Sequence, residues 1–350
     1  MSEASVRRAF LEQAQWCETL GSPFTSLLCT ALGERLDRRT RVGRAVLDWP
    51  GETPNATGDV LPLRLAGGLH ALVRRGLVPA LRALYPPNAM PAPEQLWQAL
   101  ADALAQHEKA LLPWLANAPQ TNEVARAGPL FAGLLTIADR TRLPLALFEI
   151  GASAGLNLNL DLFGYRFAKA SRGDPASALV LSPAWQGPPP PAAAVRIIRR
   201  AGNDIAPIDA SSSQGREKLI AYVWADQFER IARLEAALAI AGTHRPIVEA
   251  GDAADFVDRH FGAPPVAGEA RVLMHSIAFQ YLPAASQARV AQRMQDAGGA
   301  ATVDAPVAWL RFEFDPAIGA VALRLTLWPD GREQVLATGD PHGRGVRWLA

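Results

Sequence analysis

The sequence predicts an α/β protein in two parts, a helical region over residues 1–140 and a domain of alternating strands and helices over residues 141–350. In the first part, apolar residues recur at three- and four-residue spacing, which is typical of one-sided helices. At residue 143 this pattern gives way to short apolar runs that alternate with helical segments. Such alternation favours a mostly parallel sheet with right-handed crossovers.

The first part is expected to contain several helices. They are placed over residues 4–20, from Pro23 onward, and over 61–84, 93–110 and 122–140. Residues 40–60 carry Pro- and Gly-rich breaks and are expected to be loop. Pro113 is expected to limit the helix that precedes it, because proline lacks the N–H that a helix interior needs.

The second part begins with "LPLALFEIG", a short apolar run typical of a buried parallel strand, and "AGLNLNLDLF" is expected to start a helix after it. Further strands are expected over residues 195–200, 246–250, 271–276, 307–314, 321–328 and 333–338, and helices over 215–240, 252–260 and 284–297. Asp330-Gly331 is a strong hairpin signal, so the last two strands should end the sheet as an antiparallel pair.

The amino-acid composition limits the kinds of protein that the chain can be. Hydrophobic residues make up 49% and charged residues 20% of the 350 residues, and the net charge is +1. These values favour a globular protein without a nucleic-acid or membrane partner, and the absence of a secretory or membrane-spanning segment predicts a cytoplasmic location. Cys17 and Cys29 are expected to be buried thiols, and no metal site is predicted from the cysteines and histidines.

The segment "GASAG" at residues 151–155 has two interpretations. As G-x-S-x-G it is a nucleophile elbow, with Ser153 as a hydrolase nucleophile, His342 as its base and Asp252 or Asp304 as the third member. An elbow requires several strands before it and an upstream loop that donates an oxyanion N–H. The preceding 142 residues are expected to be helical, which argues against the serine hydrolase.

The second interpretation is a ligand-binding loop. A strand would deliver Glu149 at its carboxyl end, where open α/β sheets bind ligands, and a following helix would direct free N–H groups at the ligand. Glycines let the backbone turn and approach a ligand closely, although strand–helix packing alone also demands them. The candidate binding residues of this loop are Glu149, Gly151, Ala152, Ser153, Gly155 and Asn157.

Two later strand ends carry acids on the same side. Asp204, with Asp209 as the reserve, follows "VRIIRRAGN", and Asp252 follows "RPIVEAG". The alternative is that these acids cap helices, where Asp is favoured without any ligand.

These motifs carry a resemblance to a known class of enzymes. The succession E-x-G-x-x-x-G, "GDA" and a strand ending in a polar and aromatic loop resembles Rossmann-like S-adenosylmethionine-dependent methyltransferases, as does the C-terminal hairpin. The resemblance implies a methyltransferase-type sheet with S-adenosylmethionine as cofactor. It implies that Asp204 or Asp209 binds the ribose and Asp252 the adenine. Ser153 stands where many of these enzymes have a glycine, which requires Ser153 to avoid a left-handed backbone angle.

At closer range the chain is identified as a member of an uncharacterised bacterial family, the domain of unknown function 2332. The segments that carry this match span nearly the whole chain and include "APQTNEVARAG", "FEIGASAGLNLNLD", "RAGNDIAPIDA", "MHSIAFQYLP" and "GDPHG". The family assignment names no reaction.

The segment "QTNEVAR" places several polar groups at an expected helix start. One interpretation is a helix cap formed by Thr121 or Asn122. The other is a helical lid that holds Asn122, Glu123 and Arg126 over the glycine loop to recognise a substrate.

His275, at a strand end, is the candidate general base, and Tyr281 in the following loop is the second candidate catalytic residue. The sequence therefore predicts methyl transfer to a small molecule. The alternatives are a module that binds S-adenosylmethionine or a nucleotide without catalysis, and the serine hydrolase. The methyl acceptor and the oligomeric state stay open.

Overall fold

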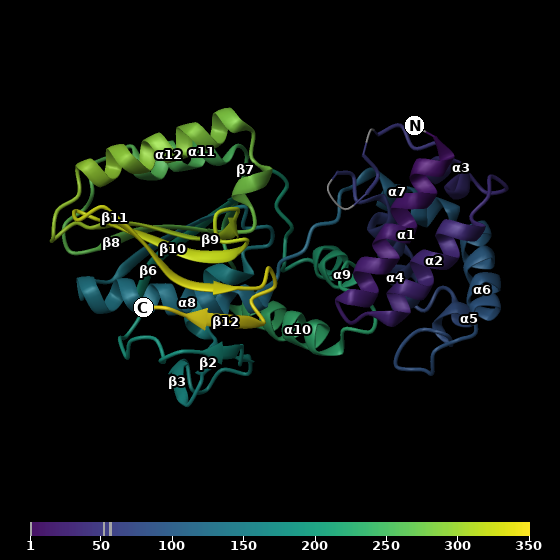
Figure 1. The fold of residues 1–350 in the computed structure, drawn as a ribbon, viewed down its shortest axis with the longest axis horizontal. Coiled ribbons are helices and arrows are strands. Elements are labelled where there is room, and N and C mark those ends of the chain that lie inside the picture. The colour runs from purple at the N-terminus through teal and green to yellow at the C-terminus, as the bar shows by residue number, and fades with distance from the viewer. Residues whose placement is uncertain (1, 52, 56–57) are drawn as a thin grey trace. The chain divides into compact units, whose positions relative to one another are not determined.

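The computed structural model describes residues 2–51, 53–55 and 58–350 (Figure 1). Contacts within the chain define two compact units, Met1–Thr121 with Ser213–Ala232, and Asn122–Ser212 with Arg233–Ala350. The expected boundary at residue 140 differs from this division, because the helix that precedes the first strand packs on the sheet and belongs to the second unit. The predicted α/β class with an N-terminal helical region is confirmed.

The first unit is built from helices. They are α1 (Glu3–Thr19), α2 (Pro23–Arg35), α3 (Arg41–Leu47), α4 (Leu61–Arg74), α5 (Pro79–Arg82), α6 (Pro93–Gln106), α7 (Glu108–Ala116) and α9 (Ser213–Ala221). Their inward faces form one apolar core, in which Phe10, Leu32 and Leu69 are fully buried. Two expectations are wrong. Residues 40–60, of which 52, 56 and 57 lie outside the described residues, contain α3. Pro113 lies inside α7, where its missing N–H costs one hydrogen bond of a short helix.

The second unit contains a mixed sheet of nine strands among the described residues, in the order β5-β12-β11-β10-β9-β8-β1-β6-β7. Its strands are β1 (Leu145–Ile150), β5 (Ala184–Gln186), β6 (Ile197–Asp204), β7 (Val248–Ala250), β8 (Ala270–Ser276), β9 (Val307–Asp315), β10 (Ala320–Trp328), β11 (Arg332–Gly339) and β12 (Gly345–Trp348). The run β7-β6-β1-β8-β9 is parallel throughout, and β9 to β12 form an antiparallel meander. A smaller sheet has the order β3-β2-β4, with β2 (Gly164–Phe167), β3 (Ala170–Gly173) and β4 (Val180–Leu181).

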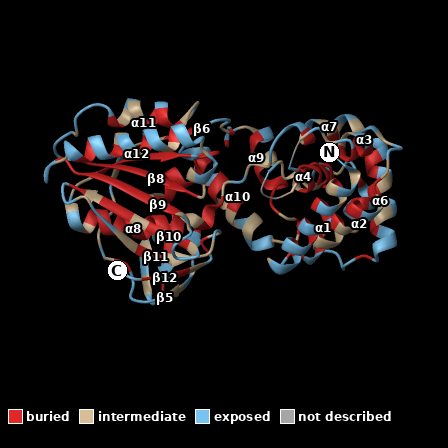
Figure 2. Ribbon diagram, turned by 45° about the horizontal axis from the view of Figure 1, so that its top comes forward, coloured by how far each residue is buried: buried red, intermediate tan, exposed pale blue. Residues whose placement is uncertain are grey.

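Helices cover both faces of the large sheet. Helices α11 (Ala253–Phe261) and α12 (Ala284–Gly299) lie on one face and α8 (Ala127–Thr141) on the other (Figure 1). Helix α10 (Phe228–Thr243) precedes β7. The strands between these layers are largely buried (Figure 2). The core on the α11 side joins Phe148 of β1, Phe256 of α11 and Met294 of α12.

The hairpin predicted at Asp330-Gly331 is confirmed, since β10 and β11 pair antiparallel on either side of it. The hairpin does not end the sheet, because the short strands β12 and β5 extend it further. The helix expected over 215–240 is two helices, α9 and α10. The helix expected at "AGLNLNLDLF" is instead the kinked 3₁₀ helix η2 (Leu156–Leu162).

Among the helices that the structure describes, none is long and apolar enough to cross a membrane.

The packing of α12 on the sheet yields a stability prediction. A Cβ added at Gly298 would lie 2.3 Å from the Trp328 indole, whereas one added at the adjacent Gly299 would meet nothing within 4 Å. Trp328 is buried, so Gly298→Ala should lower the free energy of unfolding by about 1–3 kcal/mol through overpacking. Gly299→Ala, the matched control, should leave it unchanged or raise it by up to about 1 kcal/mol. Urea unfolding measures both, and an equal effect of the two substitutions would contradict this packing.

Candidate functional site

Strand β1 delivers Glu149 to the interior of the sheet. All six residues of β1 are buried, and the strand pairs in parallel with β6 on one edge and β8 on the other. Glu149 lies opposite Gly202 of β6 and Met274 of β8. Because the carboxyl ends of parallel strands meet at one edge, the segments that follow these three strands lie together there.

The electrostatics of this edge are dominated by a buried carboxyl group. Glu149 is 2% exposed. Burial, followed by repulsion from the Asp204 carboxylate, raises the pKa of Glu149 to about 8, and attraction to Arg126 opposes the rise. Glu149 therefore binds its proton far more tightly than an exposed carboxyl group does.

The loop after β1 turns through several left-handed residues. Gly151, Ser153 and Gly155 have φ of 67°, 55° and 72°. The expectation that Ser153 avoids a left-handed angle is wrong, and a side chain held there costs about 1–2 kcal/mol. A Cβ added at Gly151 would lie 2.4 Å from Ala278. Gly151 is therefore explained by packing within the chain. Ala152 is buried, and its N–H donates to the Asn203 carbonyl of β6 at 2.9 Å.

The first N–H group of η2 is not free for a ligand, contrary to the expectation. The N–H of Leu156 donates to Oδ1 of Asn122 at 3.0 Å. Since η2 is a short 3₁₀ helix that is kinked at Asn159, its peptide dipoles also add over fewer residues than in the α-helix that the prediction assumed.

The segment "QTNEVAR" packs directly on the glycine loop. Besides the bond from Leu156 to Asn122, the Asn157 side-chain amide donates to the Glu123 carbonyl at 3.4 Å. Val124–Arg126 forms the 3₁₀ helix η1, and the buried Glu123, rather than Thr121 or Asn122, accepts the capping bond from the N–H of Ala125. The lid position over the loop and a capping role thus occur together, whereas substrate recognition by Asn122, Glu123 and Arg126 stays a prediction.

Arg126 ties this segment to two further loops. Its Nε donates to the Pro341 carbonyl at 2.8 Å and its Nη1 to the Ser276 carbonyl at the end of β8 at 3.2 Å. The bond to Pro341 holds the turn "GDPHG" beside this segment, and Nδ1 of His342 in this turn lies 3.5 Å from Oε2 of Glu123. Sequence reasoning considered His342 only for a hydrolase, and nothing local in the sequence indicates its pairing with Glu123.

The acids of the next strand ends have structural roles within the chain. Asp204 accepts from the N–H of Ser153 at 2.8 Å, so it shapes the glycine loop. Asp252 is the N-cap of α11 and also accepts from the Ser286 hydroxyl at 2.8 Å, which agrees with the helix-cap alternative. Asp209 follows the end of β6 in the sequence and accepts hydrogen bonds from the N–H and the hydroxyl of Ser211. The ribose and adenine roles assigned to these acids stay predictions.

Buried oxygen atoms without a hydrogen-bond partner gather at the same loop. Within the described part of the chain, Oε2 of Glu149, Oγ of Ser153 and Oδ1 of Asn157 are buried and accept or donate no hydrogen bond. Buried polar groups are otherwise nearly always paired, and leaving one unpaired costs about 1–3 kcal/mol. Three such atoms within nine consecutive residues mark this loop as the place where a polar ligand would supply the missing bonds.

His275 is placed as a core residue. Its exposed fraction is 0%, its Nδ1 lies 2.6 Å from Oε1 of Glu313, and its Nε2 accepts from the Trp309 indole at 3.0 Å. Burial would raise the pKa of Glu313, but hydrogen bonds from His275 and the loop N–H groups lower it. Both ring nitrogens of His275 are hydrogen-bonded within the core, so neither is free to take a proton from a substrate. Tyr281 is 74% exposed on the 3₁₀ turn η3 (Phe279–Tyr281).

The geometry of a serine hydrolase is not assembled around Ser153. Its hydroxyl has no hydrogen-bond partner among the residues that the structure places. His342 faces Glu123, and Asp252 is bonded to Ser286 and the start of α11. A nucleophile needs a base within hydrogen-bond reach.

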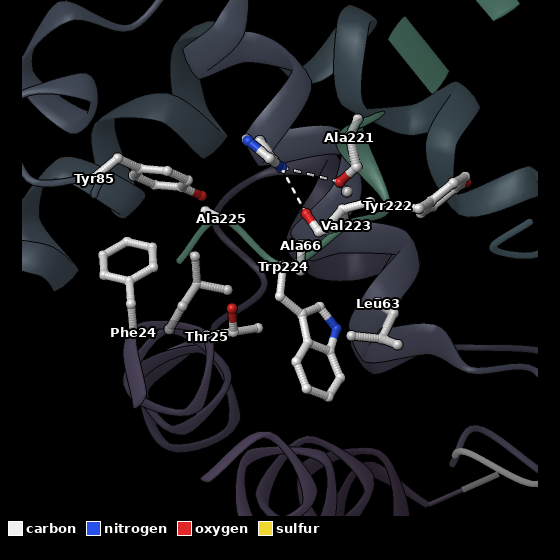
Figure 3. Close-up of a pocket in the computed structure, with 13 residues that line it drawn as sticks. Phe24, Thr25, Leu63, Ala66, Tyr85, Ala221, Tyr222, Val223, Trp224 and Ala225 are labelled. Atoms are coloured by element: carbon white, nitrogen blue, oxygen red, sulfur yellow. Dashed lines mark hydrogen bonds between the residues drawn. The ribbon is translucent and has the colours of Figure 1, made fainter. Parts of the chain in front are cut away.

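The helical unit holds a small hollow of its own (Figure 3). Its volume is about 20 Å³, room for about one water molecule. Nδ1 of His70 donates to the Ala221 and Val223 carbonyls at 3.2 and 3.1 Å, and burial lowers the pKa of His70 to about 4. The Tyr85 hydroxyl also lines the hollow. The hollow is too small for a substrate.

No group of three or more His, Cys, Asp or Glu side chains suited to a metal ion occurs in residues 2–51, 53–55 and 58–350.

A glycine loop, flanked by acids at the carboxyl edge of a parallel sheet, defines an α/β protein with a candidate small-ligand site. The chain belongs to the family described as "Uncharacterized protein conserved in bacteria (DUF2332)", whose model matches residues 7–348. No curated protein and no solved structure matches the chain.

The raised pKa of Glu149 predicts a pH-dependent stability. The folded-state pKa of about 8 exceeds the ordinary value of 4.5, so the folded protein binds more protons between these values and loses stability as the pH rises. Because glutamine does not titrate, Glu149→Gln should abolish this pH-dependent loss of stability. The free energy of unfolding of the variant, relative to the wild type, should therefore rise by a few kcal/mol between about pH 4.5 and pH 8. Urea unfolding across this range measures the difference, and a difference independent of pH would contradict the buried, protonated Glu149.

Proposed function

We propose that the second unit binds S-adenosylmethionine at the glycine loop and transfers its methyl group to a small molecule. The observation that carries the proposal is the set of three unpartnered buried oxygens of Glu149, Ser153 and Asn157. They lie where the carboxyl ends of parallel strands form a ligand-binding edge. The parallel run β7-β6-β1-β8-β9 supports it, because an acid lies within two residues of the carboxyl end of each of β1, β6 and β7.

The residues of this edge fit a polar, positively charged ligand. Burial and the Asp204 carboxylate favour the protonated form of Glu149, and a cation bound beside the two groups would favour its ionised form. The Ser153 hydroxyl can donate and accept, and Oδ1 of Asn157 can accept. The loop and the segment around Asn122 would exclude water from the ligand, which strengthens these interactions.

S-adenosylmethionine supplies an electrophilic methyl group on a positively charged sulfur. A lone pair of the acceptor would form the new bond to the methyl carbon while the carbon–sulfur pair moves to the sulfur, and the acceptor proton would pass to water. The protein would contribute mainly alignment and desolvation. His275 has no part in this proposal, because its ring nitrogens are engaged in the core.

Calorimetric titration with S-adenosylmethionine tests the binding step. The wild type should bind saturably, and Asp204→Asn should bind at least about tenfold more weakly, since the loop loses a charged partner. Asp296→Asn is the matched control and should bind as the wild type does, because Asp296 is exposed on α12 and its carboxylate accepts a hydrogen bond from the Gln292 side chain. Thermal unfolding checks that both variants fold. Absence of binding to the wild type would overturn the methyltransferase and the non-catalytic binding module together.

Two further readouts separate the alternatives. Conversion of bound S-adenosylmethionine to S-adenosylhomocysteine with a small-molecule acceptor distinguishes a methyltransferase from a binding module. Covalent labelling of Ser153 by a fluorophosphonate would favour the hydrolase. No described residue forms a hydrogen bond with the Ser153 hydroxyl, so we expect no labelling.

A further inference from the structure

A second hollow lies on the α11 face of the sheet. Its volume is about 390 Å³, within the range of small-molecule sites. Half of the residues that line it are basic, and no acidic residue lines it among the described residues. The basic members are Arg199, Arg200, Arg259, His260 and Arg271.

The hollow is separate from the glycine loop. Arg271 lies opposite Ala146 near the start of β1, whereas Glu149 lies near its end. Three residues of a strand span about 10 Å. Binding of a ligand in this hollow therefore does not depend on a ligand at the glycine loop.

Two of these arginines, Arg199 and Arg259, are oriented by acidic residues that do not themselves line the hollow. Arg199 donates through Nη2 to Glu269, and Arg259 donates through Nη2 to Glu249 at 2.6 Å. Each guanidinium has five N–H groups in a planar fork. Each is held in place by one carboxylate and retains further donors for a ligand in the hollow. Arg199 and Arg259 are about half exposed, with side-chain fractions of 48% and 52%.

Arg271 is a buried cation that forms no ion pair with a carboxylate of the described residues. It is 3% exposed, and its amino groups donate to the carbonyls of His260, Ala263 and Pro264 at 2.6–3.0 Å. The His260 carbonyl lies in the last turn of α11 and the other two follow this helix, and a cation is favoured at a helix C-terminus. Its Nε nevertheless has no hydrogen-bond partner in the part of the chain that the structure describes. A buried donor left unpaired beside a hollow is the second indication of a ligand there.

We propose that this hollow binds a small organic oxyanion, a phosphate ester or a carboxylate, through Arg199, Arg259 and Arg271. Guanidinium groups match the paired oxygens of both anions. The remaining lining is partly apolar. Phe148 lies 6.0 Å below the Arg199 guanidinium, and Val266 is 50% exposed at the rim. An anion that carries an aryl or alkyl group therefore fits better than a bare inorganic ion.

The test is a calorimetric titration of the full chain with phenyl phosphate, benzoate, inorganic phosphate and uncharged benzyl alcohol. We expect saturable binding of phenyl phosphate or benzoate, weaker binding of inorganic phosphate and none of benzyl alcohol. Tighter binding of phenyl phosphate assigns the site to a phosphate ester, and tighter binding of benzoate assigns it to a carboxylate. No saturable binding of either aryl anion at millimolar concentration would overturn the proposal.

Variants locate the binding. Arg199→Gln and Arg259→Gln should each weaken binding by about tenfold, since each removes a charge-assisted contact, and Arg271→Met should weaken it at least as much. Arg289→Gln is the matched control, because Arg289 is equally exposed and ion-paired but lies on α12 outside the hollow. Equal affinity in the hollow variants and the control would overturn the assignment. The exposed positions of Arg199 and Arg259 keep the test valid if Arg271→Met fails to fold.

Discussion

The burial of β1 between two parallel neighbours is the constraint on which the candidate site depends. Backbone bonds to β6 and β8 fix the register of β1, and side chains cover both of its faces. In that position Glu149 lies in the interior, and the segments that leave the three strands converge at one edge. Arg126 and Asn122 then hold the preceding segment against this edge. The elevated pKa of Glu149 and the shape of the loop both follow from this placement.

Much of the parallel sheet could be predicted because its main strands have recognisable local sequence patterns. The apolar runs of β1 and β8 and the Asp330-Gly331 turn are signals within a few neighbouring residues. The strands that sequence reasoning missed, such as β5 and β12, are too short to show a period, and they pair across more than a hundred residues. Their positions depend on tertiary packing that no local pattern encodes.

The candidate site could be predicted in part for the same reason. The glycine loop is a contiguous motif, and its position after a buried strand was predicted. The contacts of His275 with Glu313 and of Glu123 with His342 join segments that are distant in the sequence, so they were not predicted. The same loop departs from ordinary folding rules, with a left-handed Ser153 and unpaired buried oxygens. Departures of this kind concentrate at functional sites, where residues that serve binding can lower the stability of the fold.

A crystal structure of the chain grown with S-adenosylhomocysteine tests the central claim most directly. The account predicts the ligand at the carboxyl edge of β1, with its polar atoms bonded to Oε2 of Glu149, Oγ of Ser153 and Oδ1 of Asn157. A ligand bound elsewhere, or crystals in which these three oxygens bond to one another or to ordered water without any ligand, would contradict it.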